Sequence, residues 1–101
     1  MASLSIPVAE LLSKYHGKNL FLNGLVNIND RVAEVLSEFP GILWLNGLTY
    51  LSDSSALSLS KFKGNGLYLK GLTNISNTAA QLLVVRKDKI AISYKIIHKY
   101  S

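Results

Sequence analysis

The sequence contains no cysteine, and this excludes a disulfide framework, a thiolate zinc site and a cysteine nucleophile. Two prolines and seven glycines are too few for a flexible linker or a collagen-like chain. The N-terminal stretch MASLSIPVAELL has no positively charged region of the kind that secretory signals carry, and no apolar run approaches the roughly 18 residues that a membrane span needs. We therefore expect a cytoplasmic protein without a membrane partner.

Acidic residues are also scarce, and their distribution along the chain is uneven. The chain carries 11 Lys and Arg against six Asp and Glu, which gives a formal net charge of +5. Residues 1–60 contain three basic and five acidic side chains, whereas residues 61–101 contain eight basic side chains and one acidic side chain. This gradient indicates an anionic partner at the C-terminal half, unless the lysines serve only to keep a rather apolar chain in solution.

A repeated segment organises nearly the whole chain. The copies LFLNGLVNINDRVAEVLSEFPG, LWLNGLTYLSDSSALSLSKFKG and LYLKGLTNISNTAAQLLVVRKD begin at Leu20, Leu43 and Leu67, so the offsets are 23 and 24 residues. The hydrophobic content of 49% suits one folded domain over residues 1–101, built from about four coils of chain. We divide it into a partial repeat at 1–19, repeats at 20–42, 43–66 and 67–89, and a terminal strand at 90–101.

Each unit joins a segment with the period of a strand to a segment with the period of a helix. Leu43 and Leu45 alternate as in a strand, whereas Ala56 and Leu59 lie three residues apart, as on one face of a helix. We expect parallel strands, each preceded by a helix, at residues 19–23, 42–46, 66–70 and 89–94. We predict that the helices are capped by Asp30, Asp53 and Asn77 and end in left-handed backbone angles at Gly17, Gly41 and Gly64.

The repeated unit resembles the leucine-rich repeat family in its cysteine-containing or GALA-like variety, whose unit reads Leu-x-x-Leu-x-Leu-x-x-Cys-x-x-Ile-Thr-Asp-x-x-Leu-x-x-Leu. The central unit matches these columns with Leu43, Leu45, Leu48, Leu51, Ser52, Asp53, Ala56 and Leu59. A similar unit occurs in bacterial repeat proteins of unassigned function. The resemblance implies a short α/β solenoid with a parallel sheet on its concave side and helices on its convex side. Where the family places cysteine or asparagine, this chain has Leu25, Leu48 and Leu72, so we expect no ladder of buried asparagines.

One column of the repeat holds aromatic residues on the side of the strands that is expected to face solvent. Phe21, Trp44 and Tyr68 each stand between two inward-pointing leucines, and Ala91 follows in the fourth unit. Aromatic residues exposed in a row indicate a binding surface, although the same residues also stabilise neighbouring strands by packing. The alternation of the strands further predicts that the polar readers of a partner are Asn23, Asn46 and Lys70.

The remaining polar side chains do not form a catalytic or metal-binding pattern. His16 and His98 have no Asp, Glu or Cys at the spacing of metal ligands, and the Gly-x-Ser-x-Gly motif of serine hydrolases is missing. We therefore expect no enzymatic activity, no cofactor and no bound metal.

The C-terminal segment departs from the repeat after Ser93. Ile90, Ile92, Tyr94 and Ile96 continue the alternation of a strand. A long final strand would leave an open edge that invites pairing with a second copy, whereas a tail that folds back would cap the end of the array.

The whole pattern predicts a non-enzymatic protein-interaction module that binds a protein partner through the concave face. One alternative is a nucleic-acid-binding protein that uses the basic C-terminal half and stacks bases on Trp44 and Tyr68. The other is a self-assembling structural subunit, or homo-oligomer, joined through its open ends.

Overall fold

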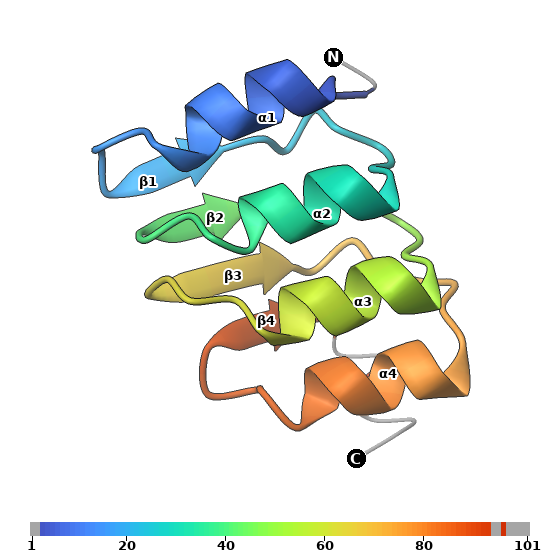
Figure 1. The fold of residues 1–101 in the computed structure, drawn as a ribbon. Coiled ribbons are helices and arrows are strands. Elements are labelled where there is room, and N and C mark those ends of the chain that lie inside the picture. The colour runs from blue at the N-terminus through green and yellow to red at the C-terminus, as the bar shows by residue number, and fades with distance from the viewer. Residues whose placement is uncertain (1–2, 94–95, 97–101) are drawn as a thin grey trace.

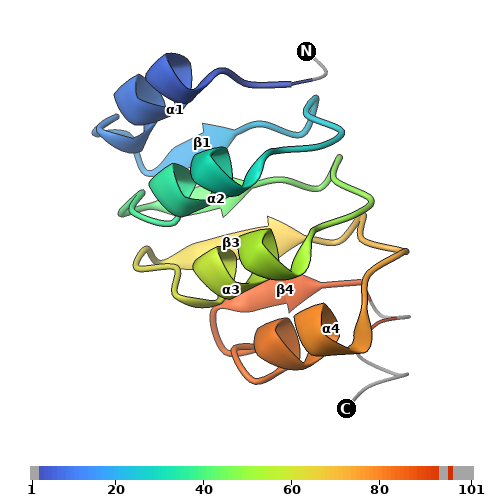
Figure 2. The same ribbon diagram turned by 45° about the vertical axis from the view of Figure 1, so that its right-hand side comes forward.

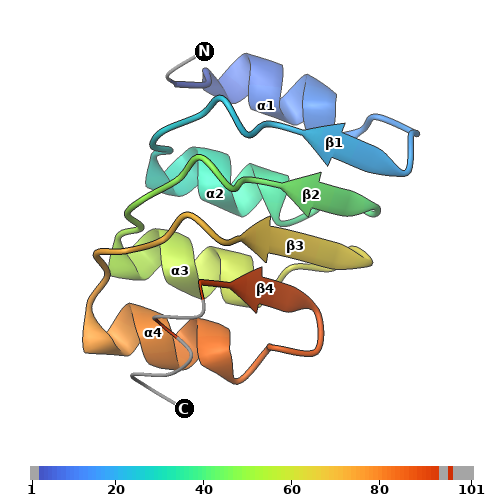
Figure 3. The same cartoon turned by 180° about the vertical axis from the view of Figure 1, so that it is seen from behind.

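Helices and strands alternate along the chain and form two layers. The computed structural model describes residues 3–93 and residue 96. Within these residues, the strands form one open parallel sheet in the order β1-β2-β3-β4. All four helices lie on one face of this sheet (Figure 1), and the opposite face, which we call the uncovered face, has no helix over it (Figure 3). The elements are α1 (Ile6–Ser13), β1 (Asn19–Phe21), α2 (Asp30–Leu36), β2 (Ile42–Trp44), α3 (Asp53–Ser60), β3 (Gly66–Leu69), α4 (Asn77–Val84) and β4 (Ile90–Ile92).

The register of the sheet follows the repeat in the sequence. Leu20 pairs with Leu43, Leu43 with Leu67, and Leu67 with Ile90. The prediction of parallel strands, each preceded by a helix, is therefore confirmed, although every strand is shorter than its predicted range. Equal positions of the repeat lie side by side because each unit advances the chain by one strand.

The last strand ends earlier than the sequence pattern predicted. β4 stops at Ile92, and Ile96 is buried and helical, so the expected continuation of the strand as far as Ile96 is wrong. The amide of Ile96 donates to the carbonyl oxygen of Ser93 at 3.0 Å, which turns the chain instead of extending it. Tyr94, Lys95 and residues 97–101 lie outside the described residues.

The core lies between the helices and the sheet and is built from two kinds of repeat column. Leucines on the sheet side of the core, such as Leu43, Leu45 and Leu48, are fully buried. Alanines at the facing helix positions, Ala33, Ala56 and Ala80, are also fully buried. Their small side chains let the helices approach the sheet closely, so leucine is not needed at this helical position.

The helices begin one residue earlier than the sequence indicated. The caps are Asn29, Ser52 and Ser76, whose side-chain oxygens accept hydrogen bonds from the amides of Val32, Ser55 and Ala79 at 2.8, 3.0 and 3.0 Å. The prediction that Asp30, Asp53 and Asn77 are the caps is therefore wrong, because these three residues are the first helical ones. A carboxylate in the first turn still favours the positive end of the helix dipole.

The two aspartates instead join neighbouring units. The carboxylate of Asp30 accepts hydrogen bonds from the hydroxyls of Ser52 and Ser55, the latter at 2.8 Å. Asp53 repeats the arrangement by accepting a hydrogen bond from the Ser76 hydroxyl. Each of these serine caps therefore binds its own helix and the helix of the preceding unit.

These hydrogen bonds predict an acid-sensitive contribution to stability. The hydroxyls of Ser52 and Ser55 lower the pKa of the Asp30 carboxyl below its ordinary value of 3.8. Because the folded state then binds this proton less tightly than the unfolded state, the contribution is present above pH 3.8 and is lost as the pH falls through the folded-state pKa. We expect the melting temperature of Asp30→Asn, measured by circular dichroism between about pH 5 and 2, to fall less steeply than that of the wild type.

A control variant keeps the Asp30 carboxyl and removes one donor. Ser55→Ala leaves only the Ser52 hydroxyl as a side-chain donor to Asp30, so its acid dependence is expected to lie between those of the wild type and Asp30→Asn. If all three proteins lose stability in parallel as the pH falls, the hydrogen bonds to Asp30 do not cause the dependence.

The glycines allow close approach of the backbone between units. No glycine in the described residues has a positive φ, so the prediction of left-handed angles at Gly17, Gly41 and Gly64 is wrong. A side chain at Gly41 would instead place its Cβ 2.4 Å from the carbonyl oxygen of Lys18 in the preceding unit. A Cβ added at Gly47 or Gly71 would lie closer still, 2.1 Å from the carbonyl oxygen of Asn23 or Asn46 respectively.

Candidate functional site

Three aromatic side chains form a continuous stack across the sheet, which we call the aromatic ladder. Phe21, Trp44 and Tyr68 are paired in register on β1, β2 and β3. The ring centroids of Phe21 and Trp44 lie 5.3 Å apart with an angle of 21° between the planes, and those of Trp44 and Tyr68 lie 3.9 Å apart at 3°. The residue of β4 that pairs with Tyr68 is Ala91, so the aromatic ladder ends at β3. The leucines before and after each aromatic residue are buried, so the ladder lies on the uncovered face.

The three rings differ in how much of them solvent can reach. Phe21 is 63% exposed to solvent, whereas Trp44 and Tyr68 are half-buried because they cover each other. The Trp44 indole Nε1 donates to Asn19 Oδ1 on β1 at 3.0 Å, which satisfies its polar atom and fixes the ring. At the other end the Lys70 ammonium lies 5.8 Å from the centroid of the Tyr68 ring. Contacts within the protein therefore fix the positions of the rings in the aromatic ladder.

The stacking decides which part of each ring a partner can touch. Trp44 lies between Phe21 and Tyr68, so both faces of the indole are occupied. A nucleobase stacks on a free ring face, and Trp44 offers none, while Tyr68 has one face against Trp44. The ladder presents ring edges and the outer face of Phe21, so a base cannot stack on Trp44, whereas apolar side chains can contact the ring edges.

The two asparagines predicted as polar readers are engaged within the protein. Asn23 Oδ1 accepts a hydrogen bond from the amide of Asn46, and Asn46 Oδ1 accepts one from the amide of Lys70, both at 2.9 Å. Their carbonyl oxygens therefore hold neighbouring units together and are not free for a partner. The sequence predicted no ladder of buried asparagines at the column of Leu25 and Leu48, and the asparagine ladder found here is a different one, because its side chains are not buried and stand two positions earlier in the repeat.

A signal for this second ladder was present in the sequence. The pair Asn-Gly recurs at Asn23 and Asn46, directly after the strand in two successive units. An amide side chain repeated at a strand end can satisfy the backbone of the next unit, and the following glycine allows the backbones to come close. Of the three predicted readers, Lys70 has an exposed side chain with its ammonium near the ladder.

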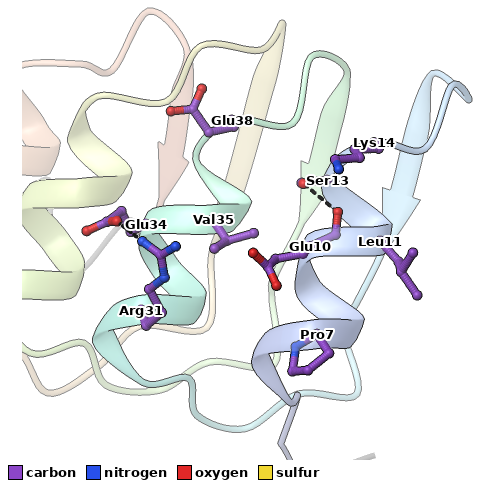
Figure 4. Close-up of a pocket in the computed structure, with 9 residues that line it drawn as sticks. All are labelled: Pro7, Glu10, Leu11, Ser13, Lys14, Arg31, Glu34, Val35 and Glu38. Carbon is purple, nitrogen blue, oxygen red and sulfur yellow. Dashed lines mark hydrogen bonds and ion pairs between the residues drawn. The ribbon is translucent and has the colours of Figure 1, made fainter.

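A groove with a volume of about 650 Å³ lies between α1 and α2. In Figure 4 Glu10 points from α1 toward α2, whereas Leu11 points away from it. Arg31 and Glu34 on α2 form an ion pair on the wall of the groove. The lining contains carboxylates and cations but no histidine that could act as a base near neutral pH. The residues that line the groove are Pro7, Glu10, Leu11, Ser13, Lys14, Arg31, Glu34, Val35 and Glu38.

The part of the chain that the structure describes contains no cluster of possible metal ligands. There, no three His, Cys, Asp or Glu side chains lie close enough together to hold an ion. His16 is exposed, and His98 lies outside the described residues. Among the described helices, none combines the length and the apolar character that crossing a bilayer requires.

The aromatic ladder is thus the feature that the fold presents most distinctly. It repeats one strand position in three units and leaves Phe21 open to solvent. The chain matches no protein-family model, no curated protein and no solved structure.

Proposed function

We propose that this chain is a short leucine-rich-repeat solenoid of about four coils that acts as a non-enzymatic protein-interaction module through the uncovered, concave face of its sheet. The offsets of 23 and 24 residues between units support the solenoid, as does the parallel register that they produce. In this family-like arrangement the helices form the convex side, and the sheet is the surface left for a partner.

The aromatic ladder carries the proposal. Aromatic residues dominate the energetics of protein interfaces, because they bury a large area at a small cost in conformational entropy. In this chain the Trp44 ring is already held by two neighbouring rings and by its hydrogen bond to Asn19, so little further ordering is lost on binding. Packing between strands explains the stack, but it does not explain an open Phe21 at its end.

The chemistry of the face defines the partner that it fits. Ring edges along β1, β2 and β3 suit an apolar segment that crosses the strands. Lys70, exposed beside Tyr68, would pair with a carboxylate at one end of that segment. We therefore expect the partner to be a peptide or protein segment with apolar side chains and an acidic residue.

Phe21→Ser tests this function because it removes the most exposed ring without opening the core. Peptides selected from a phage-displayed random library against the wild-type chain are expected to lose at least about tenfold in affinity for this variant, measured by isothermal titration. Stability should change little, since Phe21 is 63% exposed. The matched control is Leu11→Ser, which removes an apolar side chain that is 73% exposed on α1, away from the uncovered face.

The control fixes the meaning of each outcome. Selected peptides that bind the wild type and Leu11→Ser equally, and bind Phe21→Ser weakly, support the uncovered face as the binding surface. Peptides that ignore Phe21→Ser, or a library that yields no binder, contradict the proposal.

A further inference from the structure

The positive charge of the chain gathers along one edge of the two-layer structure. The four loops that lead from a helix into the following strand lie side by side at the left in Figures 1 and 2. We call these loops, residues 14–18, 37–41, 61–65 and 85–89, the basic edge. They contain two acidic residues, Glu38 and Asp88, so the edge carries a formal charge of +5, equal to that of the whole chain. The basic residues on it are Lys14, Lys18, Lys61, Lys63, Arg86, Lys87 and Lys89.

The opposite edge of the structure is different. The loops that lead from a strand into the next helix contain no charged residue at 22–29 and 45–52, and Lys70 is the one charged residue at 70–76. The helices that follow begin with Asp30 and Asp53 on this side. Among the residues that the structure describes, the charge is therefore polarised from edge to edge, which the halves of the sequence show only in part.

Two cations of the basic edge are used inside the protein. Lys63 forms an ion pair with Glu38 at 3.0 Å. The Arg86 guanidinium donates to the carbonyl oxygens of Ser60 and Phe62, and it thereby closes the end of α3. The other five are lysines with exposed side chains and no ion-pair partner among the described residues: Lys14, Lys18, Lys61, Lys87 and Lys89.

Helix dipoles do not account for all five lysines. A cation is favoured in the last turn of a helix, yet none of the four helices has a basic residue in its last turn. Lys14 and Lys61 stand at the C-caps of α1 and α3, where a dipole contribution is expected. Lys18, Lys87 and Lys89 lie further along their loops, where no helix dipole stabilises them and their ammonium groups can reach an anion from outside the chain.

We propose that the basic edge binds the phosphate backbone of a nucleic acid. Lysines on successive units form a row of point charges, and a nucleic-acid strand presents a matching row of phosphates. Binding of this kind requires no free ring face, so it does not depend on stacking at Trp44. It is expected to be independent of base sequence and to use a surface separate from the aromatic ladder.

The apolar side chains of the edge favour nucleic acid over a lipid surface. Phe39 and Phe62, which stand in two of the loops, are buried in the core. Tyr15 stacks on Phe39, with centroids 6.4 Å apart. The exposed large apolar side chains of these loops are Val85 at 73% and Tyr15 at 49%, and a single valine together with a single stacked tyrosine is a weak anchor for a bilayer.

The test is the salt dependence of binding to a fluorescein-labelled oligodeoxythymidylate of about 20 nucleotides, followed by fluorescence anisotropy between about 50 and 200 mM salt. If three or four lysines contact phosphates, the logarithm of the association constant should fall with the logarithm of the salt concentration with a slope of about −2 to −3. The double variant Lys61→Gln, Lys87→Gln should reduce that slope by about 1.4, because each lost phosphate contact contributes about 0.7.

A control variant changes the net charge equally at another place. Arg31→Gln combined with Gln81→Glu also lowers the charge by two, on exposed positions of α2 and α4 outside the basic edge. Its slope should equal that of the wild type. If the first double variant does not fold, as judged by circular dichroism, Lys14→Gln with Lys18→Gln replaces it.

The remaining outcomes overturn the proposal. Absence of binding at the lowest salt removes it, and equal weakening by both double variants shows that only net charge matters. Binding to vesicles of phosphatidylcholine and phosphatidylserine without binding to the oligonucleotide would assign the edge to a lipid surface instead.

Discussion

Gly47→Ala is expected to lower the free energy of unfolding by about 3 to 4 kcal/mol, a large part of what a domain of this size possesses. The added Cβ would lie 2.1 Å from the carbonyl oxygen of Asn23 and 2.5 Å from that of Leu25. Both are backbone atoms of the preceding unit, so no side-chain rotation relieves the clash. Two units would have to move apart, which would also stretch the hydrogen bond from the amide of Asn46 to Asn23. Urea unfolding followed by far-ultraviolet circular dichroism measures the loss.

Gly66→Ala provides the matched control in the neighbouring strand. Its Cβ would meet only the Ile42 side chain and the Lys89 carbonyl oxygen, at 3.7 Å or more, which is ordinary contact. This substitution is expected to be neutral or to stabilise by about 0.4 to 1 kcal/mol, because alanine restricts the unfolded chain. Equal losses for the two variants would mean that close approach between units does not explain Gly47.

Trp44→Ala is expected to cost about 2 to 4 kcal/mol and to abolish peptide binding at the uncovered face. The sequence predicted that this ring lies on the side of the strands that faces solvent. In the structure the ring is half-buried between Phe21 and Tyr68, and its indole nitrogen is bonded to Asn19. Truncation removes two ring contacts and one hydrogen bond together. Thermal and urea unfolding would measure the cost, with Trp44→Phe as a control that keeps a ring in the stack.

Fluorescence of this single tryptophan gives an independent measurement. A half-buried indole should be quenched by acrylamide less than free tryptophan and more than a core residue.

Two results would change this interpretation. If Trp44→Ala unfolds at the same urea concentration as the wild type, the stack contributes no stability. A blue shift that grows with protein concentration would show that a second copy covers the uncovered face, which would support self-assembly over a different protein partner.

The sequence repeat was sufficient to predict the sheet, because its register depends on hydrophobic periodicity. Leu20, Leu43, Leu67 and Ile90 occupy one repeat column, and they lie side by side on four strands. A shift by one residue would turn every leucine away from the core, so the pattern permits one register. The aromatic column followed from the same alternation.

Details that depend on single atoms could not be predicted in this way. At the start of α2, α3 and α4 two adjacent residues are both good caps, such as Ser52 and Asp53, and propensity does not say which of them is the cap and which is the first helical residue. The glycines were interpreted by their backbone freedom, whereas Gly47 is required by the carbonyl oxygen of Asn23 in the preceding unit. The half-burial of Trp44 depends on the rotamers of its neighbours, which no periodicity encodes.

The same packing between units has a consequence for how such a chain can change over time. α1 packs on α2, α2 on α3, and α3 on α4, and the amides of Asn46 and Lys70 each donate to an asparagine of the preceding unit. A duplicated copy of residues 43–66 would meet residues 67–89 on one side, as the original unit does, and on the other side it would meet a unit with Asn46 and Asp53 in the places of Asn23 and Asp30. Gene duplication could therefore lengthen the protein by one whole rung, adding another aromatic ring to the ladder. Affinity for a long partner would then be adjusted by the number of units inherited rather than by substitution within any one of them.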